Sequence, residues 1–332
     1  MTVLDDPTPV ALGDDVSISG LTVSYGTTTA LRDAHLHIPA GTTTALVGES
    51  GSGKSTLALA ASRLLPPDAS ITAGSVRVGE TDLAALTGRP LREARGSVAA
   101  YLAQDASVAL NPVLRVGGQI AEVHRVRHGA GRREAAALAE QNLADVGIPD
   151  PARVARRYPH ELSGGMRQRA VIAIALAFRP RLLIADEPTT ALDMTVQADI
   201  LALVGRLQRQ CGLTVLWITH DMSVVAEIAD RVAVMYGGRI VEQADVLTLF
   251  ESPAHPYTRA LLRCFQEGRT ARPKQILTAI NGSPPVGGVP DGCPFHPRCP
   301  KADDSRCRTV LPEPRPIVRD QQAACHHLEF TS

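Results

Sequence analysis

Short apolar runs alternate with helix-forming stretches along this chain. Four of these runs predict buried β-strands: Thr44–Val47, Ser97–Ala103, Leu182–Ala185 and Thr214–Thr219. The stretches that predict helices are Leu57–Ser62, the apolar helix that ends at Phe178, and Met194–Gln210. Strands and helices that follow one another in this way predict an α/β core.

Two regions depart from this alternation. Val16–Tyr25 has the period of a half-buried strand, and with Leu36–Ile38 and Gly74–Val78 it predicts short antiparallel strands beside the core. Between Val113 and Arg157 the chain becomes rich in alanine and arginine, which predicts helices. We therefore expect an antiparallel β region before the core and a helical insertion within it.

A glycine-rich loop between the first core strand and its helix fits the phosphate-binding pattern G-x-x-x-x-G-K-[ST]. Glycines let successive backbone N–H groups point at phosphate oxygens, and the helix that follows adds its positive end. Lys54 is expected to contact the β and γ phosphates, and the Ser55 hydroxyl to bind Mg²⁺. The strand–loop–helix context favours this function over a chance glycine turn. The expected nucleotide-binding residues of the loop are Gly48, Ser50, Gly51, Gly53, Lys54, Ser55 and Thr56.

Composition limits the classes of partner. Basic and acidic residues both number 34 and aromatic residues make up 3% of the 332 residues, which argues against nucleic acid as the main partner. The longest apolar run, Ala170–Phe178, has nine residues, whereas about 20 are needed to cross a bilayer. A membrane function would therefore require a partner. Residues 1–15 predict a loose acidic leader without a secretory signal, so the six cysteines are expected to be thiols or metal ligands.

Several polar residues stand where strands are predicted to end. Gln104 follows one core strand, at the edge where open α/β sheets place ligand contacts, although a solvated glutamine is the alternative. Asp186 can hold Mg²⁺ through its water shell, and Glu187 can polarise a water that attacks the γ phosphate. An acidic pair that only caps a helix is the alternative. Tyr25 ends its strand where it could stack on adenine, or it packs on neighbouring strand residues.

Two more sites indicate a function only when they are considered together with the other motifs and their order in the chain. Ser163 is a good helix N-cap, and Gly164 and Gly165 expose backbone N–H groups at the start of the apolar helix, which makes a second anion-binding helix end. His220 stands at the carboxyl end of another core strand. A single cap or a lone histidine is usually structural, so neither carries a function alone.

Together these motifs, in this order, resemble the motif set of the ATP-binding-cassette (ABC) ATPases over about residues 16–245. The resemblance implies a RecA-like P-loop core with an antiparallel β subdomain and a helical signature subdomain at about residues 107–178. It implies ATP and Mg²⁺ as cofactors, with Mg²⁺ held through Ser55, Gln104 and Asp186. It also implies a sandwich of two cassettes around two nucleotides.

The resemblance also assigns roles. Gln104 would be the Q-loop residue that links the γ phosphate to the transporter contact, Glu187 the catalytic base and His220 the switch histidine. Asp193 would be the D-loop residue that crosses the cassette interface. The signature residues that would act on the partner's ATP are Ser163, Gly164, Gly165 and Met166. The commonest signature has glutamine where Met166 stands, and the backbone and Ser163 are expected to preserve the phosphate contact.

Further segments resemble the peptide and nickel importer ATPases: Tyr158–Glu161, the Met-Arg-Gln-Arg run from Met166, and Ser252–Thr258. This family pairs two cassettes with two transmembrane permease subunits and an extracytoplasmic solute-binding protein. The resemblance implies a peripheral protein on the cytoplasmic face of the cell membrane, with a similar but distinct second cassette as its partner and no nucleic acid. Peptides lead among the expected solutes, ahead of nickel chelates, glutathione and certain oligosaccharides.

Residues 246–332 predict an irregular extension, dense in proline and glycine between Asn281 and Pro300. It carries Cys293, Cys299, Cys307 and Cys325, with five, seven and seventeen residues between them. Four thiolates can bind zinc or an iron–sulfur cluster, and these spacings lack the close pairs common in zinc sites. The segment from Cys293 to Pro300 resembles the importer family's cysteine motif, which implies a four-iron four-sulfur cluster; unligated thiols are the alternative.

Two other functions fit an ABC cassette. Soluble ABC proteins that act on nucleic acid or ribosomes usually carry two cassettes or a long coiled coil, and this sequence shows neither an internal repeat nor a sustained heptad. An exporter cassette has no obvious use for the cysteine extension. Cys211 and Cys264 fall in predicted helices and are expected to pack there.

Overall fold

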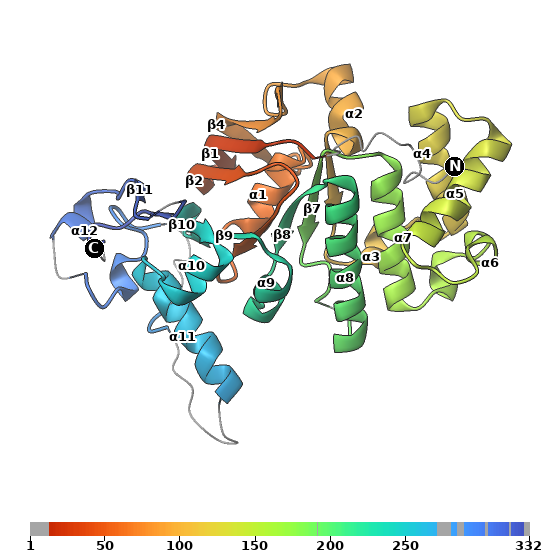
Figure 1. The fold of residues 1–332 in the computed structure, drawn as a ribbon. Helices are drawn as coiled ribbons and strands as arrows, with labels where there is room; N and C mark the ends of the chain where they lie inside the picture. The colour runs from red at the N-terminus through yellow and green to blue at the C-terminus, as the bar shows by residue number, and fades with distance from the viewer. Residues whose placement is uncertain are drawn as a thin grey trace.

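The computed structural model describes residues 13–190, 192–270, 280–283, 289–302, 305–318 and 320–328. Its main sheet has the strand order β11-β12-β10-β9-β3-β8-β7-β6, and the strands from β9 to β6 run parallel (Figure 1). The strands of this sheet are β3 (Thr43–Val47), β6 (Ala99–Leu102), β7 (Leu182–Asp186), β8 (Thr214–Ile218), β9 (Arg231–Tyr236), β10 (Arg239–Asp245), β11 (Arg315–Pro316) and β12 (Gln322–Ala323).

A smaller antiparallel sheet lies over the phosphate-loop helix α1 (Lys54–Ala61), in the order β2-β1-β4-β5. Its strands are β1 (Val16–Tyr25), β2 (Thr28–Ile38), β4 (Ala69–Val78) and β5 (Thr81–Asp82). The prediction of β1 is confirmed at both ends. The predictions for β2 and β4 were too short, because the missed half of β4 is mostly exposed and therefore lacks an apolar alternation.

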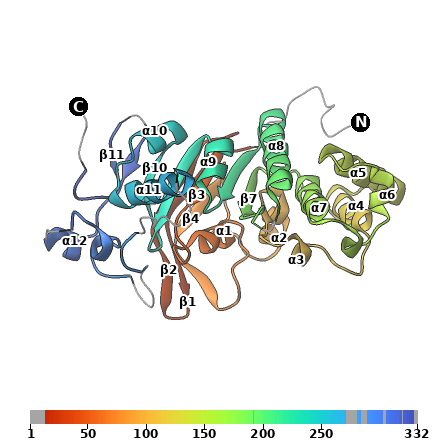
Figure 2. The same ribbon diagram turned by 90° about the horizontal axis from the view of Figure 1, so that it is seen from below.

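Helices cover the main sheet and build a separate subdomain at one end. The subdomain contains α4 (Val116–His128), α5 (Arg132–Asp145), α6 (Pro151–Ala155), η1 (Pro159–Glu161) and α7 (Gly164–Ala177). The shorter helices α2 (Gly88–Ser97) and α3 (Ala106–Ala109) flank β6. The strand predicted from Ser97 begins at Ala99 instead, because Ser97 ends α2 with its hydroxyl donating to the carbonyl oxygen of Glu93 at 2.6 Å. Figures 1 and 2 both place the α4–α6 region at the end of the molecule opposite to the C-terminal segment.

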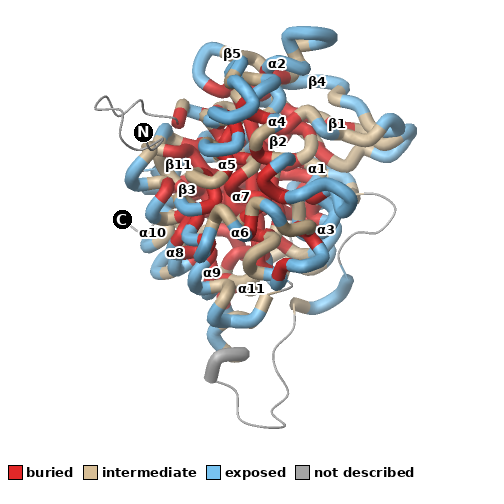
Figure 3. Tube along the Cα trace, turned by 90° about the vertical axis from the view of Figure 1, so that its right-hand side faces the viewer, coloured by how far each residue is buried: buried red, intermediate tan, exposed pale blue. Residues whose placement is uncertain are grey.

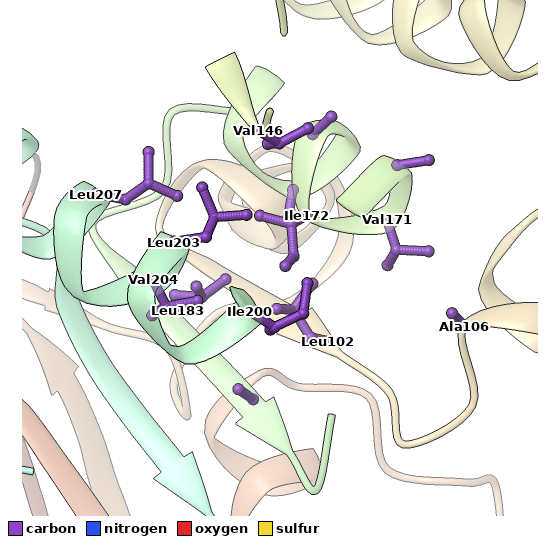
Figure 4. Close-up of a cluster of buried hydrophobic side chains, with 14 of the residues drawn as sticks. Leu102, Ala106, Val146, Val171, Ile172, Leu183, Ile200, Leu203, Val204 and Leu207 are labelled. Carbon is purple, nitrogen blue, oxygen red and sulfur yellow. The ribbon is translucent and has the colours of Figure 1, made fainter. Parts of the chain in front are cut away.

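The core beneath α7 and α8 (Met194–Cys211) joins this subdomain to the main sheet. Side chains of both helices meet those of β6 and β7, with Ile172, Leu203 and Leu183 fully or almost fully buried among them (Figure 4). The buried segments run through the centre of the fold, while exposed turns lie around it (Figure 3). The parallel strands β3, β7 and β8 are buried at every position, as expected for a sheet covered on both faces.

Replacing Ile172 by alanine should lower the free energy of unfolding by about 2–5 kcal/mol, because it leaves a cavity among close-packed side chains. Ile172 is 0% exposed between α7 and its neighbours. Leu247→Ala is the matched control, since Leu247 on α10 (Val246–Glu251) is 68% exposed. Chemical denaturation of both variants measures the difference. Equal losses would show that Ile172 does not contribute through core packing.

The C-terminal segment is more regular than predicted. It contains α10, α11 (Pro256–Thr270), η2 (His296–Arg298) and α12 (Ser305–Thr309), and β12 adds to the edge of the main sheet beside β10. α11 contains Cys264, as the predicted helix there required, and the described part of 281–300 is irregular apart from η2, as predicted. The short strands β11 and β12 were not predicted. Of the predicted leader, residues 1–12 lie outside the described residues, and Asp14 pairs with Arg181 at 2.6 Å.

Candidate functional site

A cleft of about 800 Å³ lies at the carboxyl ends of β3, β7 and β8, beside the tip of the small sheet. It contains most of the predicted nucleotide and catalytic residues. Its lining is Thr27–Ala30, Arg32, Glu49–Thr56, Gln104, Glu187, His220, Tyr236–Gly238 and Val289. The cleft therefore brings together motifs that are far apart in the sequence.

The phosphate loop adopts a conformation that only glycine fits at its two motif positions. Gly48 has φ +155°, and a Cβ there would lie 2.2 Å from the carbonyl oxygen of Met235. Gly53 has φ +107°, and a Cβ would lie 2.9 Å from Leu31. Because these two glycines lack a side chain, the phosphate loop can pack closely against β9 and β2.

Lys54 points back across this loop. Its Nζ donates to the carbonyl oxygens of Gly48 at 2.8 Å and Glu49 at 3.0 Å. Burial lowers the pKa of Lys54, and the nearby carboxylates of Glu187 and Asp186 oppose that shift. The ammonium is therefore held at the cleft by weak neutral acceptors, which phosphate oxygens with full charges can replace.

Glu187 sits directly after β7 with its backbone at φ +47°, a conformation rare for a side chain that is not glycine. Its N–H donates to the carbonyl oxygen of Ile218 at 3.0 Å, which fixes it to β8. The two carboxylate oxygens lie 3.0 Å from Nδ1 of His220 and 3.1 Å from Oγ1 of Thr190. This carboxylate is held at the cleft, where it can accept a proton from an attacking water.

Three predicted residues, Tyr25, Gly48 and Asp186, are not among the described residues that line the cleft. Asp186 is buried and accepts a hydrogen bond from the Tyr101 hydroxyl at 3.0 Å, and burial together with this carboxylate raises the pKa of Tyr101. The Tyr25 hydroxyl lies 3.5 Å from Oγ1 of Thr56.

The signature segment and Asp193 lie away from this cleft as helix N-caps. The Ser163 hydroxyl accepts from the N–H of Met166 at 3.3 Å at the start of α7. Asp193 accepts from the N–H of Val196 at 2.9 Å at the start of α8. A Cβ on Gly165 would lie 2.6 Å from Val196, so the glycine lets the two helix starts approach. Of the described residues that line the cleft, none belongs to the signature segment.

One wall of the cleft was not predicted from the sequence. That wall comes from the turn before β2, the Tyr236–Gly238 turn between β9 and β10, and Val289. The Gly-Gly turn was a recognisable hairpin signal. Nothing in the spacing of motifs indicated that the C-terminal segment would reach the nucleotide cleft.

The four C-terminal cysteines come from three segments that pack together. Cys293, Cys307 and Cys325 are buried and Cys299 is half-buried. Burial, with smaller contributions from the other three cysteines, raises the pKa of Cys293 to about 11. Four soft sulfur donors suit an iron–sulfur cluster chemically. Within the described part of the chain, however, no three His, Cys, Asp or Glu side chains are arranged as a group that could hold a metal ion.

Among the described residues, no helix has both the length and the apolarity needed to cross a bilayer. The phosphate loop, the acidic pair at the end of β7 and the helical subdomain define an ABC-type ATPase cassette. The "ABC transporter" family model matches residues 31–190, and the "Oligopeptide/dipeptide transporter, C-terminal region" model matches residues 241–307. The chain belongs to the oligopeptide/dipeptide branch of the ABC transporter ATPases.

Relatives of known description support this assignment. The chain is 46% identical to a putative peptide import ATP-binding protein of Brucella melitensis, over 89% of this chain and 90% of the relative. It is 44% identical to the dipeptide transport ATP-binding protein DppD of Bacillus subtilis, over 86% of each chain. The solved structure of the ATP-binding cassette MJ0796 bound to ADP and Pi is similar, with a TM-score of 0.62 and 27% identity over 70% of this chain and 98% of that one. The predictions of the fold class and of the ATPase activity are confirmed.

Proposed function

We propose that this chain is the ATP-hydrolysing subunit that powers import of di- or oligopeptides through a membrane ABC transporter. The observation that carries the proposal is the pairing of a complete ATPase cassette with the oligopeptide/dipeptide C-terminal region in one chain. Relatives whose names state peptide import align with nearly the whole chain. Nickel or another small solute remains the alternative cargo.

The residues of the cleft support separate roles in ATP hydrolysis. Lys54 and the N–H groups of the phosphate loop bind the β and γ phosphates. Mg²⁺ would be held through Ser55, Gln104 and Asp186, and it neutralises charge on the phosphates. Glu187 orients the attacking water and accepts its proton, while His220, 3.0 Å from that carboxylate, holds the γ phosphate.

The same geometry supports closure by a second cassette. Ser163 and the α7 N-terminus lie outside the chain's own cleft, which supports a role of this positive helix end on ATP bound by the partner. Asp193 at the start of the adjacent α8 would cross the same interface. We propose a distinct but similar cassette protein as this partner.

A groove of about 640 Å³ on the helical subdomain supports contact with the membrane subunits. Its apolar lining includes Leu114, Val126, Ile174 and Phe178, and Val126 is 73% exposed. Part of the groove's lining, between Ala109 and Arg127, comes from the segment that follows Gln104, so the chain itself links an occupant of the groove to a residue of the nucleotide cleft. We propose a short apolar helix of a permease subunit as its occupant, which would place the chain on the cytoplasmic face of the membrane, with an extracytoplasmic solute-binding protein on the other side.

Co-purification under native conditions tests this function. The expected result is that the tagged chain, extracted in mild detergent, brings down two membrane subunits and a second cassette. Mass spectrometry identifies them, and a Val126→Asp variant should reduce their recovery. Recovery of ribosomes or DNA in place of membrane subunits would contradict the proposal and favour a soluble ABC protein.

We further propose that Cys293, Cys299, Cys307 and Cys325 bind a four-iron four-sulfur cluster. The softness of four sulfur donors, the burial of three of them and the electrostatic interaction of Cys293 with the other three support this proposal. Anaerobically purified protein is expected to be brown and to contain about four iron and four sulfide per chain, as the cluster type requires. A Cys211→Ala control, outside this segment, should keep the same content. Colourless, iron-free protein would contradict the cluster.

A further inference from the structure

Arg298 belongs to the cysteine-bearing segment, yet its side chain reaches the phosphate loop 249 positions away in sequence. Nη1 donates to Oε2 of Glu49 at 2.5 Å, and Nη2 donates to Oε1 at 3.0 Å. The Arg298 side chain is only 4% exposed and that of Glu49 24%. This is a bidentate ion pair, sheltered from solvent, on the residue that follows Gly48.

The remaining donors of Arg298 are also engaged. Nε donates to the carbonyl oxygen of Asn281 at 2.9 Å, and Nη2 also to that of Ile280 at 3.2 Å. Nη1 also donates to the hydroxyl of Tyr236, which lines the cleft, at 3.3 Å. Arginine has five N–H donors in a rigid fork, and these five acceptors match that number. A lysine, with three N–H donors, could not form all five of these hydrogen bonds.

A second route joins the same segment to the same loop residue. The Phe295 ring packs against the rings of Tyr236 and Tyr257, with centroids 5.2 and 5.3 Å apart. The hydroxyl of Tyr257 accepts a hydrogen bond from the backbone N–H of Glu49 at 2.9 Å. The C-terminal segment therefore holds both the side chain and the backbone of Glu49.

Glu49 in turn contacts the phosphate-binding lysine. Its carbonyl oxygen accepts a hydrogen bond from Lys54 Nζ at 3.0 Å. Glu49 also lines the cleft, so without a partner its negative charge would repel a bound triphosphate. Arg298 of the C-terminal segment is placed to neutralise the charge of Glu49 and to hold the phosphate loop in position.

We propose that Arg298 is a positioning residue of the nucleotide site, so that the C-terminal segment and MgATP binding are energetically coupled through Glu49. The inference rests on the proposed nucleotide site, and it holds whether or not the cysteines bind a cluster. By linkage, nucleotide binding must stabilise the 293–299 segment as much as that segment favours nucleotide binding.

A double-mutant cycle on the purified 332-residue chain tests the coupling, with MgATP affinity measured by calorimetry. Arg298→Gln should raise the Kd about tenfold, because a charged, bidentate partner of the loop is lost. In a Glu49→Gln background the same substitution should change the Kd by less than about twofold, since the repulsive charge is already gone. The loss of MgATP affinity in the single variant Arg298→Gln should also be smaller at high salt, because salt screens the repulsion between Glu49 and the triphosphate.

Arg231→Gln is the matched control. Arg231 also ties the C-terminal segment to the cassette, through Asp320 at 3.5 Å, but it does not line the cleft. Its Kd should equal that of the unsubstituted chain. An Arg298→Gln variant that binds MgATP normally, or a loss of the same size in both backgrounds, would overturn the coupling. If the unsubstituted chain does not bind MgATP, the proposed nucleotide site itself fails.

Hydrogen exchange provides the reciprocal readout. MgATP should slow amide exchange in peptides covering residues 293–299 of the unsubstituted chain, and this protection should be lost in Arg298→Gln. A general loss of folding would instead speed exchange everywhere, with or without nucleotide. No nucleotide-dependent change in this segment of the unsubstituted chain would contradict the inference.

Discussion

Replacing Glu187 by glutamine is expected to lower the kcat of ATP hydrolysis by the assembled transporter at least about a hundredfold, while MgATP still binds. The amide keeps the size of the side chain and can still contact Thr190 and His220, which lie 3.1 and 3.0 Å from the carboxylate. It cannot accept the proton of the attacking water. Phosphate release and nucleotide binding are measured on the same preparation.

Glu227→Gln is the control for this substitution, because Glu227 is an exposed carboxylate on α9 (Met222–Ile228). It should hydrolyse ATP at the unsubstituted rate. An assembled Glu187→Gln complex that retained normal turnover would remove Glu187 from the role of catalytic base, even if every other part of the site were correct.

Replacing Lys54 by methionine is expected to raise the Kd for MgATP at least about a hundredfold, since the only ammonium of the phosphate loop is lost from a partly desolvated position. Lys54 is 7% exposed and burial lowers its pKa, so the fold without nucleotide disfavours the charge that phosphate oxygens would stabilise. Arg206→Met on the exposed face of α8 is the control for loss of a basic side chain. Calorimetric titration measures both.

Normal affinity in Lys54→Met would mean that nucleotide binds elsewhere. The thermal unfolding midpoint without nucleotide should remain close to that of the unsubstituted chain, because burial disfavours the ammonium and a methionine side chain tolerates the same buried position. MgATP should then raise the midpoint of the unsubstituted chain and leave that of Lys54→Met unchanged.

The sequence predicted the core strands well because their signal is local. Runs such as Leu182–Ala185 are apolar at every position, and a parallel strand buried on both faces requires such a run. The motif residues could be placed for the same reason: Gln104, Glu187 and His220 each follow one of these strands, and all three line the cleft. Parallel strands carry their carboxyl ends to one edge, so the order of motifs was enough.

The rest depended on contacts between distant parts of the chain. No local pattern indicates that Arg298 pairs with Glu49, because each residue alone is an ordinary charged side chain. The same holds for Val289, which reaches the cleft from the C-terminal segment. Asp186 was placed correctly at the end of β7, but its burial against Tyr101 could not be inferred without the packing of β6 on β7.

ATP-dependent peptide uptake is the most direct test of the central claim, that this cassette drives peptide import. The complete transporter is reconstituted in vesicles with ATP on the side of the cassettes and a labelled peptide, with its binding protein, on the other. We predict accumulation of the peptide that requires ATP and disappears when this chain carries Glu187→Gln. Hydrolysis of ATP without uptake of any peptide offered, or uptake that persists with Glu187→Gln, would contradict the account.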